Sequence, residues 1–136
     1  MTTGGASSEI VIDVKGLRTQ FGDNIIHDNL ALAVRRNEIL GVVGGSGSGK
    51  SVLMRAIIGL KRPSAGTVKI FGEDFYAKTT REQIETERRW GVMFQGGALF
   101  SSLTVAQNVM APIREHLKLP GELAADIAAM KISMSG

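Results

Sequence analysis

The chain has 136 residues, no cysteine and a formal net charge of +3, from 16 basic and 13 acidic residues. This length allows one domain with a sizeable core, and the lack of cysteine excludes disulfide scaffolds and thiolate metal sites. The mild basic excess suits a polyanionic ligand, but the basic residues are scattered and form no stripe typical of nucleic-acid binding, so we expect no nucleic-acid partner.

The first nine residues, 1–9, are small and polar and predict a disordered tail without the apolar core of a signal peptide. No later apolar run approaches the roughly 20 residues of a membrane span. We therefore expect a soluble, cytoplasmic chain whose folded part is one domain over residues 10–136.

Short apolar segments follow the tail. Residues 10–14 predict a first strand, and residues 25–27 and 30–34 predict one or two more. Between them, Gly22-Asp23-Asn24 has the composition of a chain reversal. This part of the sequence predicts an antiparallel β layer at the front of the domain.

The next apolar run, residues 39–43, predicts a buried strand of the kind covered on both faces. It leads into Gly44-Gly45-Ser46-Gly47-Ser48-Gly49-Lys50-Ser51, which matches the phosphate-loop pattern G-x-x-x-x-G-K-[ST]. From Val52 the chain is apolar enough for a helix packed on a sheet, ending near Ile58 with Gly59 as its C-cap. Strand, glycine-rich turn and helix form the context that this motif requires.

Glycine has a physical purpose in this loop. Phosphate oxygens must reach several consecutive backbone N–H groups, and glycine leaves that approach free of Cβ atoms and allows positive φ angles. The helix N-terminus adds unpaired N–H groups and the positive end of its dipole. Lys50 would contact the β- and γ-phosphates, and the Ser51 hydroxyl would ligate Mg²⁺. The alternative is a glycine- and serine-rich turn without a ligand, but the spacing and its context favour a nucleotide site.

The rest of the chain predicts two strands and three helices. Residues 67–71 alternate like a half-exposed strand, and residues 90–94 have the pattern of a buried one. Thr80-x-x-Gln83 and Thr104-x-x-Gln107 are capping-box patterns. They predict helices over residues 80–89 and 105–117, the second kinked by Pro112, and a third helix follows at 122–130.

By residue 95 the order of features resembles the nucleotide-binding subunit of an ATP-binding cassette transporter. The resemblance covers residues 10–116, and one set of motifs carries it: Phe21-Gly22, the loop 44–51, Leu60-x-x-Pro63-x-x-Gly66-x-Val68, Val92-Met93-Phe94-Gln95 and Leu99-Phe100-x-x-Leu103-Thr104-Val105-x-x-Asn108-Val109. It implies an α/β fold: a P-loop NTPase core, incomplete in this chain, with an N-terminal antiparallel β layer. Residues 96–100 and 112–116 are similar to ATPases of phospholipid-trafficking systems, of the lipid-asymmetry-maintenance or toluene-tolerance type.

The resemblance also implies that ATP and Mg²⁺ are the ligands, and it gives roles to two further residues. Phe21 would stack on the adenine ring, and the alternative is an ordinary core or turn phenylalanine. Gln95 would reach Mg²⁺ and the attacking water and would sense a transmembrane partner, and the alternative is a solvated loop glutamine. Lys50 and Gln95 would then be the catalytic pair, with Ser51 and Gln95 as metal ligands.

The implied partners are transmembrane permease subunits, which would contact residues 95–103, and a second copy of the ATPase subunit. Ala98, Leu99, Phe100 and Leu103 are apolar residues in a segment that should be exposed, which suits a partner groove. The alternative is that this loop packs on its own helix. Such a subunit would lie in the cytoplasm, peripheral to the inner face of the membrane.

The family further uses an Asp-Glu pair after an apolar strand (the Walker B motif), an L-S-G-G-Q-like signature and a switch histidine, and none occurs in this sequence. We therefore expect an N-terminal fragment with negligible ATPase activity, exposed apolar edges, and marginal stability or self-association. Two functions remain: the energy-coupling ATP-binding subunit of a transporter for lipids or organic solvents, and a short non-catalytic nucleotide-binding regulatory module. A kinase or GTPase is disfavoured because the guanine-reading motif Asn-Lys-x-Asp is absent.

The two histidines are predicted to be ordinary surface residues. His27 and His116 lie far apart in the sequence, and neither has partners at the spacing of metal ligands. Neither is therefore predicted to carry chemistry.

Overall fold

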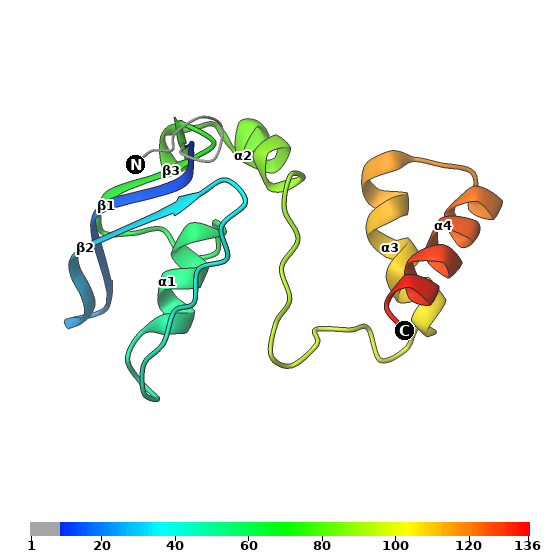
Figure 1. Cartoon of the computed structure of the whole chain (residues 1–136), viewed down its shortest axis with the longest axis horizontal. Coiled ribbons are helices and arrows are strands. Elements are labelled where there is room, and N and C mark those ends of the chain that lie inside the picture. The colour runs from blue at the N-terminus through cyan, green and yellow to red at the C-terminus, as the bar shows by residue number, and fades with distance from the viewer. Residues whose placement is uncertain (1–8) are drawn as a thin grey trace. The chain divides into compact units, whose positions relative to one another are not determined.

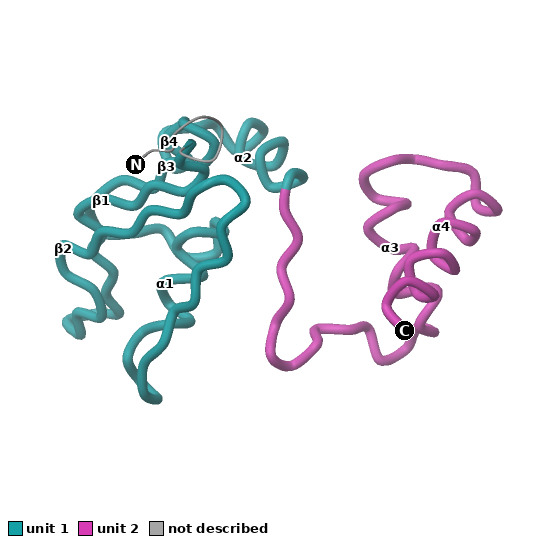
Figure 2. The backbone as a smooth tube through the Cα atoms, in the orientation of Figure 1, with its two compact units in different colours: residues 1–89 teal, residues 90–136 magenta. Residues whose placement is uncertain are grey.

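The computed structural model describes residues 9–136, so the predicted tail lies outside the described residues apart from Glu9. Glu9 is held to the fold, because its carboxylate accepts a hydrogen bond from Arg36 Nε at 2.6 Å and its carbonyl accepts one from the Arg36 N–H at 2.8 Å. The chain divides into two compact units at residues 89 and 90 (Figure 2).

The first unit is built on an antiparallel sheet with strand order β2-β1-β3-β4 (Figure 1). β1 (Ile10–Phe21) and β2 (Asn24–Arg35) form a long hairpin. β3 (Ala65–Ile70) pairs with the other edge of β1, and the short β4 (Glu73–Asp74) pairs with β3. The predicted antiparallel layer and its reversal after Phe21 are confirmed. Residues 25–27 and 30–34, predicted as one or two strands, lie in the single strand β2.

The core of this unit lies between the sheet and α1 (Lys50–Ile57). Its buried apolar residues come from both layers and from the 3-10 helix η2 (Phe75–Ala77): Val14, Leu17, Leu53, Ala56, Val68, Ile70 and Phe75. β1 is irregular, with register shifts between Val14 and Leu17 and again around Thr19. These shifts decide which side chains of β1 face β2, and the sequence pattern does not reveal them.

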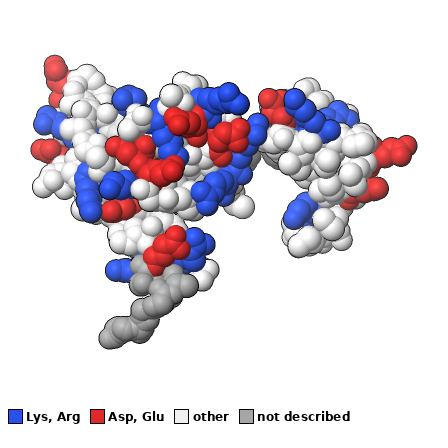
Figure 3. Space-filling view, turned by 90° about the horizontal axis from the view of Figure 1, so that it is seen from above, with Lys and Arg blue, Asp and Glu red and all other residues white. Residues whose placement is uncertain are grey.

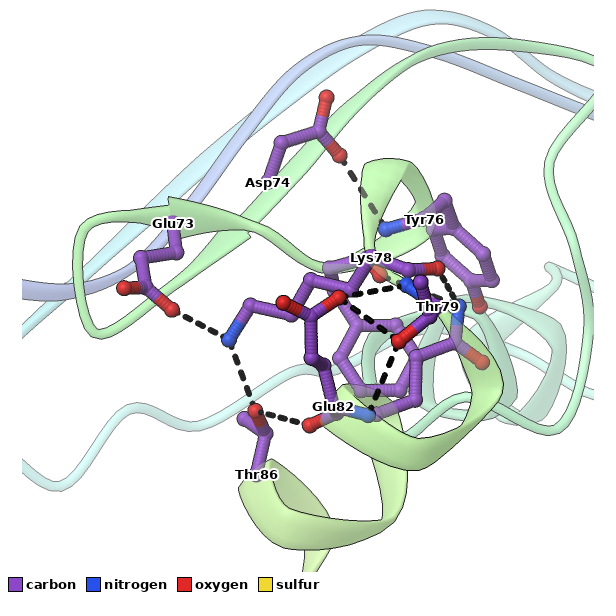
Figure 4. A network of polar contacts seen from close by, with 9 residues as sticks. Glu73, Asp74, Tyr76, Lys78, Thr79, Glu82 and Thr86 are labelled. Atoms are coloured by element: carbon purple, nitrogen blue, oxygen red, sulfur yellow. Dashed lines mark hydrogen bonds and ion pairs between the residues drawn. The ribbon is translucent and has the colours of Figure 1, made fainter.

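Figure 4 shows the polar network that joins η2 to α2 (Thr80–Glu87). The capping box of α2 is formed by Thr79 and Glu82, one residue earlier than the predicted pair. The Glu82 carboxylate accepts a hydrogen bond from the Thr79 N–H at 2.8 Å. Its hydrogen bonds with the backbone and side chain of Thr79 hold the pKa of Glu82 below its usual value. Gln83, predicted to close the box, instead donates its side-chain amide to the Phe75 carbonyl at 3.1 Å. The predicted box was wrong because Thr80, predicted as the N-cap, is already the first residue of α2.

The same network anchors Lys78 and Tyr76. Lys78 forms an ion pair with Glu73 and donates to the buried Thr86 hydroxyl at 2.8 Å (Figure 4). The Tyr76 hydroxyl donates to the Ala56 carbonyl at 2.6 Å, and burial raises the pKa of Tyr76 to about 12. Tyr76 therefore ties the end of α1 to the segment that follows β4.

Two predicted strands are absent from the described sheet. Residues 39–43 and 90–94 have no strand assignment, and Ile39, Val43 and Met93 are more than nine-tenths exposed. A strand is stable only where a neighbour accepts and donates its backbone hydrogen bonds, and among residues 9–136 no strand pairs with either segment. The apolar runs are therefore present without the parallel sheet that they predict.

The second unit is a helical hairpin of α3 (Val105–Leu117) and α4 (Gly121–Met134), side by side in Figure 1. Met110, Ala124 and Ala128 form its core, with the half-buried Val109 and Ile113 packed against them. The capping box of Thr104 and Gln107 is confirmed, and α4 extends beyond its predicted end. Within residues 9–136 no helix is both long enough and apolar enough to cross a membrane.

Candidate phosphate-binding site

The predicted phosphate loop leads directly into α1. Gly47 and Gly49 adopt φ angles of +80° and +90°, and the Gly49 carbonyl accepts the Leu53 N–H at 2.9 Å. Within the described structure no side chain caps the start of α1, and its first turn contains no acidic residue. The N–H groups at this helix end are therefore suited to an anion supplied from outside the chain.

The loop is tight at its start. A Cβ on Gly44 would lie 2.6 Å from the Ser48 hydroxyl, and the Ser48 N–H donates to the Gly45 carbonyl at 3.1 Å. Glycine at position 44 thus lets Ser48 fold back over the loop. Residues 44–48 are exposed, as a ligand-binding loop requires.

Lys50 folds back over the same loop. Its ammonium donates to the carbonyl oxygens of Gly44 and Gly45, the second at 2.9 Å, and lies 3.4 Å from the Ser48 hydroxyl. Carbonyl oxygens carry only a partial negative charge, so phosphate oxygens bearing full charges would be stronger acceptors for this ammonium. Lys50 is therefore positioned to exchange loop carbonyls for a phosphate.

The other predicted loop residues, Ser46, Ser51 and Val52, continue the same segment into the first turn of α1. Ser51 is exposed, so its hydroxyl oxygen is accessible to a ligand, whereas Val52 is half-buried. The structure thus brings together every predicted residue from Gly44 to Val52.

Phe21 lies at the end of β1 and is 50% exposed. The Lys61 ammonium sits 4.1 Å from the centroid of its ring and also donates to the Gln20 carbonyl at 2.9 Å. This exposure excludes a core phenylalanine, but the alternative of an ordinary turn phenylalanine stays open. Adenine stacking by Phe21 stays a prediction.

Gln95 lies in the second unit, in an exposed turn that the Gly97 N–H closes by donating to the Phe94 carbonyl at 3.1 Å. Gln95 thus belongs to the second unit and the phosphate loop to the first. The approach of the Gln95 amide to Mg²⁺ therefore stays a prediction.

Asn108 organises the apolar segment after Gln95. Its side chain accepts the Phe100 N–H at 2.8 Å and donates to the carbonyls of Phe100 at 3.2 Å, Leu103 at 3.3 Å and Thr104 at 2.9 Å. Leu99 and Phe100 are nevertheless 72% and 62% exposed. The backbone of this segment is thus fixed on α3 while its apolar side chains face outward. Sequence analysis missed this role, although Asn108 stands four residues after the N-cap Thr104.

The surface prediction for His27 was wrong. His27 is only 8% exposed, and its Nδ1 lies 2.7 Å from the hydroxyl of the fully buried Thr19. The two residues are opposite each other in the β1–β2 ladder, eight positions apart in sequence, so no local motif marks the pair. His116 is exposed, as predicted.

Charges on the surface are mixed. In the face seen in Figure 3, basic and acidic side chains are interspersed rather than gathered by sign. Surface ion pairs fit this pattern: Arg88 with Glu85 at 3.1 Å, and the exposed Lys15 with the half-buried Asp13 at 3.3 Å. Such pairs contribute little to stability in solvent.

The sequence model of the ABC transporter family matches residues 27–135. The chain belongs to the ABC transporter family. The predicted resemblance is therefore confirmed, and the matched range includes the phosphate loop and residues 90–135 of the second unit.

Curated relatives in this family include phospholipid-transport proteins. The chain is 40% identical to the intermembrane phospholipid transport system ATP-binding protein MlaF of Haemophilus influenzae, and the match covers 93% of this chain and 48% of MlaF. It is 37% identical to the probable ribonucleotide transport ATP-binding protein mkl of Mycobacterium leprae, over 93% of this chain and 37% of mkl. The chain thus spans about half the length of MlaF and less of mkl.

Solved ABC cassettes have the same fold. The ATP-binding cassette MJ0796, in a dimeric post-hydrolysis state bound to ADP and Pi, matches with a TM-score of 0.81 and 26% identity, over 90% of this chain and 56% of that one. Another dimeric structure of MJ0796 matches with a TM-score of 0.77 and 27% identity, over 85% and 53%. The predicted fold class, an α/β P-loop NTPase with an antiparallel β layer, is confirmed.

The phosphate loop offers an oxygen donor of the kind that Mg²⁺ prefers but not a complete set of metal ligands. Among the described residues, no group of three or more histidine, aspartate or glutamate side chains could hold a metal alone. Mg²⁺ prefers oxygen ligands, retains several waters and is commonly bound together with substrate phosphates. The exposed Ser51 hydroxyl is an oxygen donor of this kind, and its role as a Mg²⁺ ligand stays a prediction.

Proposed function

We propose that this chain binds Mg·ATP through Gly44 to Val52 and is the ATP-binding, energy-coupling part of a transporter for lipids or related apolar compounds. The observation that carries the proposal is the Lys50 ammonium, which already lies over the loop and, among residues 9–136, has carbonyl and hydroxyl oxygens as its acceptors. The uncapped start of α1 beside it supports the same ligand. Ser51 would ligate Mg²⁺, and Phe21 would stack on the adenine.

The lipid assignment rests on the relatives. Two of them carry transport names, and MlaF is named for intermembrane phospholipid transport. The exposed Leu99 and Phe100 support contact with a transmembrane permease subunit through residues 95–103, where Gln95 would link nucleotide and partner. We further propose a second copy of the subunit as partner and a location at the inner face of the membrane.

The proposal is tested by removing the lysine charge at the loop and elsewhere. Lys50→Ala should weaken Mg·ATP binding at least about tenfold, because a charge-assisted contact to phosphate is lost. Lys15→Ala is the matched control, since it removes the same charge from the exposed side of β1. Isothermal titration calorimetry measures both. If Lys50→Ala binds Mg·ATP as tightly as the unchanged chain does, the loop is not a nucleotide site.

A further inference from the structure

One glycine of the phosphate loop packs against side chains from outside the loop. A Cβ on Gly49 would lie 2.7 Å from His27 Nε2, 3.1 Å from His27 Cε1 and 2.7 Å from Ile26 Cγ2. In contrast, a Cβ on Gly45 or Gly47 would meet nothing within 4 Å in the described structure, and the atoms nearest to one on Gly44 belong to Ser48 and Lys50 of the loop itself. The imidazole edge of His27 therefore supports the end of the loop from β2.

A hydrogen bond on the side of the His27 ring away from Gly49 fixes the orientation of the imidazole. Its Nδ1 lies 2.7 Å from the Thr19 hydroxyl, and the Thr19 and His27 side chains are 0% and 8% exposed. A buried polar group is costly to leave without its partner, so the ring cannot rotate away from Gly49 without losing this hydrogen bond. The β1–β2 hairpin thus presents a rigid ring to the loop.

His27 contacts Gly49, the residue that orients the N–H groups at the start of α1. Gly49 is the N-cap of α1 in the left-handed conformation, and its carbonyl accepts the first bond of the helix from Leu53 at 2.9 Å. Its backbone angles set the direction in which the following N–H groups point. A small change at Gly49 would misdirect several donors to a phosphate at once.

We propose that His27, held by Thr19, is a positioning residue that keeps Gly49 in its left-handed conformation and so orients the start of α1 toward a triphosphate. The inference rests on the proposed function, because it concerns the same Mg·ATP site. A histidine that only fills the core would affect stability but not the geometry of the loop.

Two buried threonines allow a matched test of this difference. Thr19→Val removes the hydroxyl behind His27. Thr86→Val removes the hydroxyl of another buried threonine, in α2, which accepts from Lys78 at 2.8 Å and donates to the Glu82 carbonyl at 2.9 Å. His27→Ala removes the ring itself. For each variant of the full chain, calorimetry measures Mg·ATP affinity, NMR measures hydrogen exchange of the Leu53 amide, and a thermal melt measures Tm.

Thr19→Val and His27→Ala should weaken Mg·ATP binding about three- to tenfold, the effect of losing one buried hydrogen bond in the support of a site. Both should speed exchange of the Leu53 amide, because its acceptor is the Gly49 carbonyl. Thr86→Val should lower Tm yet leave affinity and Leu53 exchange unchanged.

The inference is overturned if Thr19→Val keeps full affinity and normal Leu53 exchange, or if Thr86→Val changes both as strongly. Should His27→Ala fail to fold, Thr19→Val alone decides. Should the unchanged chain bind no Mg·ATP, the proposed function fails, and Leu53 exchange in the free chain still decides whether Thr19 and His27 hold the loop.

Discussion

Replacing Gly49 with alanine measures how closely the β layer packs on the phosphate loop. The alanine must keep the φ of +90° that Gly49 adopts, which costs about 1–2 kcal/mol for a residue with a side chain. It also approaches Ile26 and His27 to 2.7 Å, and such overpacking costs about 1–3 kcal/mol. Gly47→Ala is the control, because φ there is +80° but the new Cβ meets nothing within 4 Å.

Gly49→Ala should therefore lower the free energy of unfolding by about 2–5 kcal/mol and Gly47→Ala by only about 1–2 kcal/mol. Urea denaturation followed by far-UV circular dichroism measures both. In a His27→Ala background the extra cost of Gly49→Ala should fall by about half, since two of the three nearest atoms belong to His27 and the Ile26 contact remains. Equal losses for Gly49→Ala and Gly47→Ala would refute the packing of His27 and Ile26 on the loop.

Three further predictions follow from contacts outside the loop. Thr79→Ala should lower the free energy of unfolding by about 1 kcal/mol through loss of the α2 cap, and Thr80→Ala should lower it by less than about 0.5 kcal/mol. Equal urea midpoints for the two variants would contradict the observed capping box. Stability should fall as pH rises from about 10 to about 12, because Tyr76 ionises near 10 when unfolded and near 12 when folded; a Tyr76→Phe chain with the same pH profile would contradict this. Asn108→Ala should speed hydrogen exchange of the Phe100 amide, and unchanged exchange would show that Asn108 does not hold the segment.

The sequence predicted well wherever the signal is local. The phosphate-loop motif, the reversal after Phe21 and the capping box of Thr104 each depend on residues a few positions apart, and all three are found. The capping box of α2 shows the limit of such signals. Adjacent threonines, Thr79 and Thr80, are each followed three residues later by a possible partner, so the pattern alone does not fix the register.

Long-range pairing was not predictable in the same way. His27 was placed at the surface because its partner, Thr19, is brought opposite it only by the register shifts of β1. Residues 39–43 and 90–94 were predicted as strands because their apolar runs indicate burial. Backbone pairing depends on a neighbouring strand, which an apolar run does not encode.

The pairing of residues 39–43 and the burial of His27 both bear on how the phosphate loop is supported. Because no strand within residues 9–136 pairs with residues 39–43, no described strand holds the phosphate loop on its N-terminal side, and residues 44–48 are exposed. Its support in the first unit comes instead through Gly49, from Ile26 and His27 on β2. If the proposed phosphate site is correct, changes that shift the register of the β1–β2 hairpin should alter nucleotide affinity even where they touch no loop residue.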